Sequence, residues 1–207
     1  PYRVYGGLSF YQRKEIKDLL AYLRLLVNEN DSEALLRVIN YPMRGIGETT
    51  QNKLIVYADS IGLSIANVLD ALPFHAPNLG INNSALTKLN DFWQMIKAFQ
   101  VMLKTENVYQ VAMEVAKKSG LIKSLKENQT PEGISRVENI QELMNSMQGF
   151  IDEQQQLEDG DPSLSNFLEN IALSADTQEN DEEGDKVSLM TIHLSKGLEF
   201  PIVYIVG

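Results

Sequence analysis

Apolar residues recur at intervals of three and four positions along most of the chain, which is the spacing of one face of an α-helix. The clearest run begins at Ile16 and continues through Leu19, Leu20, Leu23, Leu26 and Val27. The same period predicts further helices near residues 32–39, 54–61, 64–71, 86–103, 107–126, 132–156 and 162–171. Gly120 is expected to interrupt the helix over 107–126. Most of the chain is therefore predicted to be helical.

Strand-like runs of β-branched and aromatic residues mark both ends of the chain. Residues 2–5 form a short run that Gly6 ends, and residues 187–192 and 202–206 have the pattern of buried parallel strands. Residues 73–83 contain prolines, a glycine and asparagines, and are predicted to be an irregular loop. This order predicts a mainly α chain, in which a helical domain is inserted into the remnant of an α/β sheet.

Two glycines interrupt the helical pattern in the segment PMRGIGETT, residues 42–50. Gly45 and Gly47 permit positive φ and close approach, so backbone N–H groups at the start of the next helix can bind a phosphate. Ile46 would hold the turn against the core, and Arg44 would add positive charge. A turn that needs glycine for its shape alone explains the same residues, and the sequence leaves both interpretations open.

The net charge of −10 counts against a nucleic-acid partner only if the charge is evenly spread. It is not, because residues 151–185 hold twelve acidic side chains and no lysine or arginine. The remainder holds 18 basic and 16 acidic residues, so a basic face is permitted there. Residues 176–185 are acidic and lack apolar anchors, which predicts a linker.

The chain has no cysteine, which excludes disulfides and thiolate metal sites and is typical of a reducing compartment. It has no run of about 20 apolar residues that would span a membrane, and no signal-peptide pattern. We therefore expect a cytoplasmic protein with no membrane partner. Pro1 and the strand-like end at Gly207 suggest a piece of a longer protein.

A polar turn separates the two strand-like runs near the C-terminus, and it contains His193, Lys196 and Glu199. Imidazole and ammonium groups donate hydrogen bonds to anionic oxygens, while a carboxylate accepts them from sugar hydroxyls. The turn is a candidate nucleotide contact, although an ordinary polar turn explains it equally well. No GxxxxGK[ST] motif occurs, so this piece is not expected to hydrolyse nucleotide alone.

Three other residues have a structural and a functional interpretation. Arg13, at the start of the first helix, either meets DNA or belongs to an exposed helix face. His75 has no second histidine nearby, so no metal site is expected. Trp93 fits the apolar stripe of its helix, with base stacking as the alternative.

Four segments together resemble the UvrD/PcrA/Rep group of superfamily 1 DNA helicases. They are YRVYGGLSFYQRKEIKDLLAYLRLL, RVINYPMRGIGETT, SRVENIQEL and VSLMTIHLSKGLEFPIVYIVG. The resemblance covers essentially the whole chain. It implies that residues 1–10 are the edge of the second RecA-like domain (2A), 11–175 the helical 2B subdomain, 176–185 an acidic linker, and 186–207 the return to 2A with motif V.

The resemblance also implies an enzyme that uses ATP and Mg²⁺ to move 3′ to 5′ on single-stranded DNA and to unwind duplex. Gly45, Ile46 and Gly47 match the turn that contacts duplex, with Arg44 beside it. Within motif V, Thr191 and His193 match residues near the single strand, and Gly197 and Glu199 match residues that reach the nucleotide. Lys196 and Arg13 are further candidates.

The family's Walker A lysine, acidic Mg²⁺ pair, arginine finger and adenine-stacking tyrosine block are absent from this chain. We therefore expect no catalysis by it alone and no bound cofactor. Its expected partners are DNA, the rest of the helicase chain, and a repair or replication protein. The alternative is a protein-interaction or autoinhibitory module that uses its apolar helix faces and the acidic residues 151–185, and does not bind DNA by itself.

Overall fold

The computed structural model describes residues 2–4, 10–127, 129–177, 187–190, 192 and 195–206, with backbone alone for 2–4 and 174–177. Its elements are β1 (Tyr2–Val4), the 3₁₀ helix η1 (Phe10–Gln12), α1 (Lys14–Val27), α2 (Ser32–Val38), α3 (Glu48–Ser60), α4 (Ile65–Asp70), α5 (Leu72–Leu79), α6 (Asn83–Met102), α7 (Val108–Lys118), α8 (Leu121–Glu127), α9 (Pro131–Gln156), α10 (Leu164–Thr177) and β2 (Val187–Leu189). The predicted mainly α fold is confirmed.

Side-chain caps set the starts of several helices, because each satisfies a backbone N–H group that has no partner within its helix. Asp31 Oδ1 accepts from the Ala34 N–H at 2.9 Å, and Asn82 Oδ1 accepts from the Ala85 N–H at 2.9 Å. The same kind of bond is made by Ser64, Asn107 and Thr130. The caps explain why short polar residues stand between the apolar runs.

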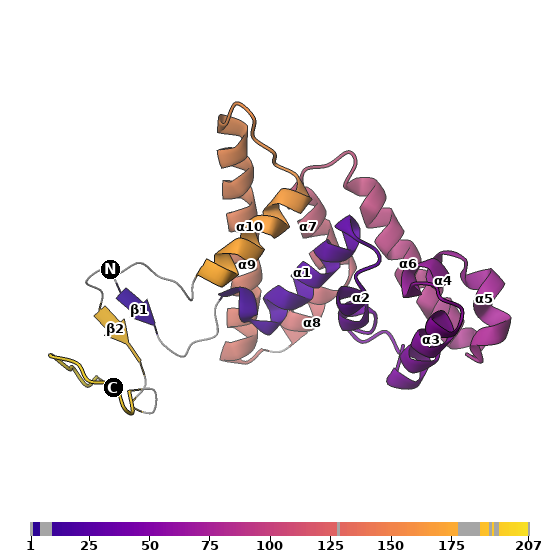
Figure 1. The fold of residues 1–207 in the computed structure, drawn as a ribbon, viewed down its shortest axis with the longest axis horizontal. Coiled ribbons are helices and arrows are strands. Elements are labelled where there is room, and N and C mark those ends of the chain that lie inside the picture. The colour runs from indigo at the N-terminus through magenta and orange to yellow at the C-terminus, as the bar shows by residue number, and fades with distance from the viewer. Residues whose placement is uncertain are drawn as a thin grey trace.

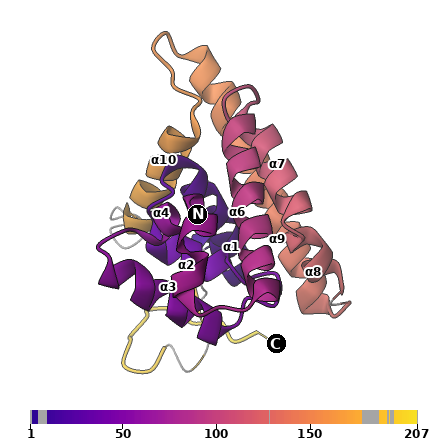
Figure 2. The same cartoon turned by 90° about the vertical axis from the view of Figure 1, so that its right-hand side faces the viewer.

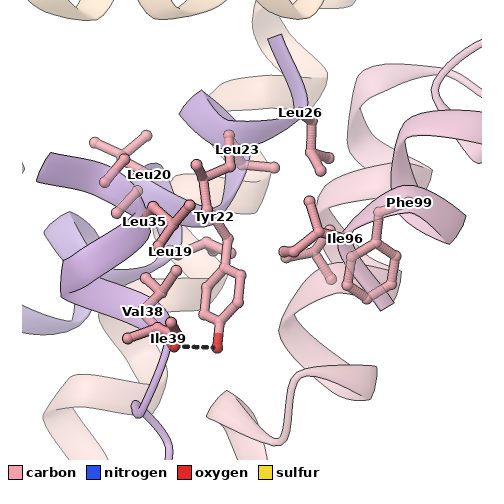
Figure 3. Packing of buried hydrophobic residues seen from close by; sticks show 14 of the residues in the cluster. Leu19, Leu20, Tyr22, Leu23, Leu26, Leu35, Val38, Ile39, Ile96 and Phe99 are labelled. Carbon is pink, nitrogen blue, oxygen red and sulfur yellow. Dashed lines mark hydrogen bonds between the residues drawn. The ribbon is translucent and has the colours of Figure 1, made fainter. Parts of the chain in front are cut away.

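The first helix, α1, is the centre of the core. It packs against α2, α6, α7, α9 and α10, and its side chains Ile16, Leu19, Tyr22 and Leu23 are fully buried. Figure 3 shows Tyr22 surrounded by side chains of α1, α2 and α6. Ten of its fourteen residues are buried, because these five helices enclose it.

The helices α3, α4 and α5 form one end of the molecule, and the two short strands lie at the other (Figure 1). The long helix α7 packs against both α6 and α9 (Figure 2). The strands β1 and β2 pair in parallel, with Tyr2 opposite Val187 and Val4 opposite Leu189. Segments from the two ends of the chain are therefore brought together.

The prediction of a loop over residues 73–83 is wrong for its first part, because α5 covers Leu72–Leu79. Pro73 lies in the first turn of α5, where a missing N–H is tolerated, although Pro77 lies inside the helix. Leu72, His75 and Leu79 are buried at helical spacing. Tertiary packing of this face therefore outweighs the local preference against helix.

The predicted buried strand at residues 202–206 is also wrong. These residues form no strand, and the exposed fractions of Ile202 and Val206 are 73% and 89%. Among the described residues, no strand runs beside them to accept and donate ladder hydrogen bonds, and a lone extended segment is not stable in water.

The remaining helix predictions are confirmed, including the interruption at Gly120, which separates α7 from α8. The strand predicted over residues 187–192 is confirmed as a parallel strand for Val187–Leu189. It is shorter than predicted and not buried, because Ile192 lies in a turn and Val187 is 63% exposed. In the part of the chain that the structure describes, no helix has the length and apolar character needed to cross a membrane.

Candidate nucleic-acid interface

The turn between α2 and α3 is held on its inner side by one asparagine. Asn40 Oδ1 accepts hydrogen bonds from the backbone N–H groups of Arg44 and Ile46, both at 3.0 Å. Ile46 is fully buried, and its carbonyl oxygen accepts a bond of 2.9 Å from the Gln51 side chain. Residues 42–47, called the glycine turn below, are therefore fixed to the helical body.

The outer side of the glycine turn is formed by its two exposed glycines. Gly45 has a φ of 75°, in the left-handed region where a side chain would be strained. Gly47 has a φ of −71° and a ψ of 169°, and a Cβ there would meet no atom within 4 Å. The backbone therefore requires glycine at 45 but not at 47, where the missing side chain only leaves the surface open.

The Lys88 side chain, on α6, reaches over the glycine turn. A Cβ built on Gly45 would lie 2.6 Å from Lys88 Nζ. Lys88 is exposed, and no carboxylate of the described residues forms an ion pair with it. Sequence reasoning missed this residue, because it lies far along the chain, on the polar face of another helix, and follows no motif.

Several backbone donors of the glycine turn and of the first turn of α3 belong to exposed residues. Within the described residues, the N–H groups of Gly45, Gly47, Glu48 and Thr49 have no hydrogen-bond partner. The first N–H groups of a helix are left without intrahelical acceptors and attract anions. The Glu48 carboxylate lies in the same first turn and opposes an anion, whereas the Lys88 ammonium group favours one.

Arg44 was predicted to offer its charge to DNA, but its guanidinium group points into the protein. Nη1 donates to the carbonyl oxygens of Val38 and Pro42, both at 3.0 Å. Nη2 donates to the Tyr22 hydroxyl at 2.7 Å and to the Ser119 carbonyl oxygen at 2.8 Å. Four of the five guanidinium donors are thus used inside the chain. Arg44 supports the glycine turn from within.

The Tyr22 hydroxyl completes this interior network. It donates to the Tyr41 carbonyl oxygen at 2.5 Å and lies 3.4 Å from the Val38 carbonyl oxygen, the bond drawn dashed in Figure 3. Burial raises the pKa of Tyr22 to about 12, and the nearby Arg44 charge opposes this rise only in part. The Arg44 guanidinium also lies 5.4 Å from the centre of the Phe92 ring.

Arg13, the second basic candidate, is bound elsewhere. Its guanidinium group donates to Asn139 Oδ1 and lies 5.3 Å from the centre of the Phe10 ring. Asn139 in turn donates to Glu15 Oε1 at 2.5 Å. Arg13 therefore connects α1 to α9 and is not part of the glycine turn.

His75 and Trp93 are core residues. His75 is 6% exposed, and its Nδ1 lies 2.9 Å from the Tyr57 hydroxyl. Trp93 is 1% exposed, and its Nε1–H donates to Asp70 Oδ1 at 2.7 Å. The alternative of base stacking by Trp93 is wrong, because neither face of a buried indole can meet a base.

The C-terminal candidates lie apart from the glycine turn, at the opposite side of the view in Figure 1. Thr191 and His193 are outside the described residues. Gly197 has a φ of 86° in a turn where the Leu198 N–H donates to the Ser195 carbonyl oxygen at 3.0 Å. The side chains of Lys196 and Glu199 are exposed.

No three histidine, aspartate or glutamate side chains of the described residues are grouped so as to hold a metal ion. Among the described residues from 187 to 206, one carboxylate is exposed, that of Glu199, and it lies close to the turn at Gly197. An ATP–Mg²⁺ complex requires a phosphate cradle and metal ligands as well. The described residues by themselves do not fit it.

Comparison with known proteins identifies the family. The sequence profile of the UvrD-like helicase C-terminal domain matches residues 1–207. The chain is 39% identical over 207 residues to proteins named ATP-dependent DNA helicase PcrA from Staphylococcus aureus and Staphylococcus epidermidis. These alignments cover 100% of this chain and 27% of each relative. The chain belongs to the family of UvrD-like helicase C-terminal domains.

Proposed function

We propose that this chain is part of a cytoplasmic ATP-dependent helicase that moves 3′ to 5′ on DNA, and that it contacts duplex DNA through the glycine turn. Residues 11–175 would be the helical 2B subdomain. Residues 1–10 and 186–207 would belong to the edge of the RecA-like domain, with the acidic residues 176–185 as a linker. Asp176 and Thr177 form the end of α10, and residues 178–185 lie outside the described part of the chain. The family match and the name of the relatives support the helicase assignment.

The observation that carries the DNA contact is the open surface at Gly47. Neither its backbone angles nor its neighbours require glycine. Its own N–H group and those of Glu48 and Thr49 have no partner among the described residues, and the Lys88 ammonium group lies over the nearby Gly45. Glycine is also an acceptable N-cap, but Asn, Asp and Ser are better ones. Close approach of a DNA backbone to the main chain at Gly47 explains why this residue has no side chain.

Such a contact reads the phosphate backbone and not the bases. Backbone N–H groups and an ammonium group recognise phosphate oxygens, which are the same in every sequence. The binding of the chain to duplex should therefore be weak, dependent on salt and nearly independent of sequence. Its role would be to hold duplex beside the motor.

The C-terminal turn would serve the motor itself. We propose that Gly197 and Glu199 contact nucleotide, with Lys196 nearby, and that Thr191 and His193 face single-stranded DNA. ATP and Mg²⁺ would be bound mainly by the rest of the helicase, since the described residues here do not fit them alone. The helical 2B subdomain would be joined to the RecA-like domain by one segment at each end, so it can rotate as a rigid body relative to that domain. Duplex DNA can shift the equilibrium between two such orientations only if it binds one of them more tightly than the other.

The test is fluorescence anisotropy of the 207-residue chain with a labelled hairpin duplex. Gly47→Leu adds bulk to the open surface and should weaken binding strongly, whereas Gly47→Ala should weaken it less. Gly149→Leu is the matched control, because a Cβ at Gly149 also meets nothing within 4 Å and lies on α9. Equal duplex binding by wild type and Gly47→Leu would show that the turn does not contact DNA.

A second function, as a protein-interaction or autoinhibitory module, is favoured by one observation. The acidic side chains of Asp152, Glu153, Glu158 and Asp159 are exposed near the end of α9, beside the exposed Leu157. Capture of a repair or replication protein that is lost when Asp152, Glu153, Glu158 and Asp159 are replaced by their amides, without duplex binding, would favour this function over the first.

A further inference from the structure

Four lysines flank the turn between α7 and α8. Lys117 and Lys118 precede the turn, and Lys123 and Lys126 follow it, and all four side chains are exposed. Lys118 pairs with Glu114 on its own helix at 2.9 Å. No ion pair with any described carboxylate is found for the other three. Lys117, Lys123 and Lys126 are called the lysine surface below.

The lysine surface surrounds a shallow hollow. Its volume is about 510 Å³, and it is lined by Lys117, Ile122, Lys123, Lys126, Glu127 and Gln129. Lys123 and Lys126 are three residues apart on α8, so their side chains lie on the same side of that helix. One carboxylate, that of Glu127, faces three ammonium groups, so the hollow has an excess of positive charge.

This surface is joined to the glycine turn. The Arg44 guanidinium donates to the Ser119 carbonyl oxygen at 2.8 Å, which connects the two turns directly. A Cβ on Gly120 would lie 3.9 Å from Pro42 Cγ, so the turns also pack against each other.

We infer that the lysine surface binds the sugar–phosphate backbone of the same DNA duplex that the glycine turn contacts. This inference rests on the proposed function. A cluster of exposed, unpaired ammonium groups raises the local positive potential and attracts anions, and a phosphate backbone supplies regularly spaced ones. Two separate contacts on one rigid body also fix the direction of the duplex, which a single turn cannot do.

The test compares two double variants of the 207-residue chain with equal charge change. Lys123→Gln with Lys126→Gln removes two members of the lysine surface, and Lys17→Gln with Lys104→Gln removes two lysines from other parts of the body. Anisotropy of a labelled hairpin duplex is measured from about 50 to 200 mM salt. For the first variant we expect weaker binding and a salt slope lower by about 1 per lysine lost.

Two unrelated duplex sequences should be affected equally, because phosphate contacts carry no sequence information. Equal affinity and salt slope in the two double variants would overturn the inference, as would an effect seen with single-stranded oligonucleotides alone. If Gly47→Leu lowers duplex binding and the lysine variant does not, the proposed function stands and this inference fails. If the wild-type chain binds no duplex, both fail.

A label gives an independent readout. The chain has no cysteine, so a thiol-reactive photo-crosslinker added to the Lys126→Cys variant attaches at position 126 only. We expect crosslinks to the hairpin duplex from this position, and none from Lys104→Cys, at the far end of α6. Crosslinking from both positions to the same extent would show contact without a defined surface and would contradict the inference.

Discussion

The Nη2 group of Arg44 donates a 2.8 Å hydrogen bond to the carbonyl oxygen of Ser119, and this bond connects the glycine turn to the turn between α7 and α8. The same guanidinium group binds Tyr22, Val38 and Pro42. An arginine that looks like a DNA contact in the sequence is therefore an internal clamp. Its importance for DNA binding should be indirect, through the shape of the turn.

Replacement of this clamp should cost stability first. Arg44→Met leaves four acceptors without this donor, and we expect the free energy of unfolding to fall by about 2–4 kcal/mol. Arg44→Lys should not restore it, because an ammonium group cannot bridge carbonyls on three sides as the planar guanidinium does. Urea unfolding followed by circular dichroism measures both. Wild-type stability together with lost duplex binding would instead indicate direct phosphate contact.

The stability of the chain should fall at high pH because of Tyr22. Its pKa is raised from 10.0 to about 12 in the folded state, chiefly by burial. Between these values the unfolded chain releases the hydroxyl proton while the folded chain keeps it, so rising pH favours unfolding. The full loss is about 2–3 kcal/mol.

Tyr22→Phe provides the comparison for this pH effect. The variant should be less stable at neutral pH, by about 1–2 kcal/mol, because the Tyr41 carbonyl oxygen loses its donor. Its stability should then fall less steeply than that of wild type between pH 10 and 12. Urea midpoints measured at several pH values test this, and parallel curves for the two proteins would contradict it.

Two glycines, one inside α9 and one shortly after its C-terminal end, should respond to alanine in opposite directions. Gly149 lies in the exposed interior of the helix, where a Cβ meets nothing within 4 Å, so Gly149→Ala should raise the free energy of unfolding by about 1 kcal/mol. At Gly160 a Cβ would lie 1.8 Å from the Gln154 carbonyl oxygen. Gly160→Ala should therefore destabilise by about 1–3 kcal/mol. Thermal or urea unfolding that gives both variants the same sign would refute this account.

The sequence predicted the helices well because their faces are buried by one another. The stripe of α6, for example, follows Leu89, Phe92, Trp93 and Ile96, and all four are buried. The prediction from sequence failed at α5. Pro73 and Pro77 disfavour a helix locally, whereas the burial of the same segment depends on residues that are distant in the sequence. The prediction also failed at residues 202–206. An apolar, β-branched pattern shows that a segment can form a strand if a partner strand is present, but it does not show that the partner is there.

The candidate site was predicted only in part. The glycine turn is visible in the sequence, because Gly45 and Gly47 flank an apolar residue between two helices. The inward direction of Arg44 is not, since its acceptors on Tyr22 and Ser119 come together only through folding. Lys88 could not be found for the same reason, as a lysine on a polar helix face is ordinary.

Lys88 provides the last prediction. Its ammonium group lies over Gly45, is exposed and has no ion-pair partner among the described residues, so Lys88→Gln should leave the melting temperature unchanged. If a phosphate binds at the glycine turn, the variant should bind the hairpin duplex more weakly, with a salt slope lower by about 1. Lys88→Arg should keep most of the affinity, because it keeps the charge. Lys104→Gln is the matched control, an exposed lysine near the other end of the same helix. A Lys88→Gln variant that matches Lys104→Gln in affinity and salt slope would mean that no phosphate approaches the turn from the side of α6.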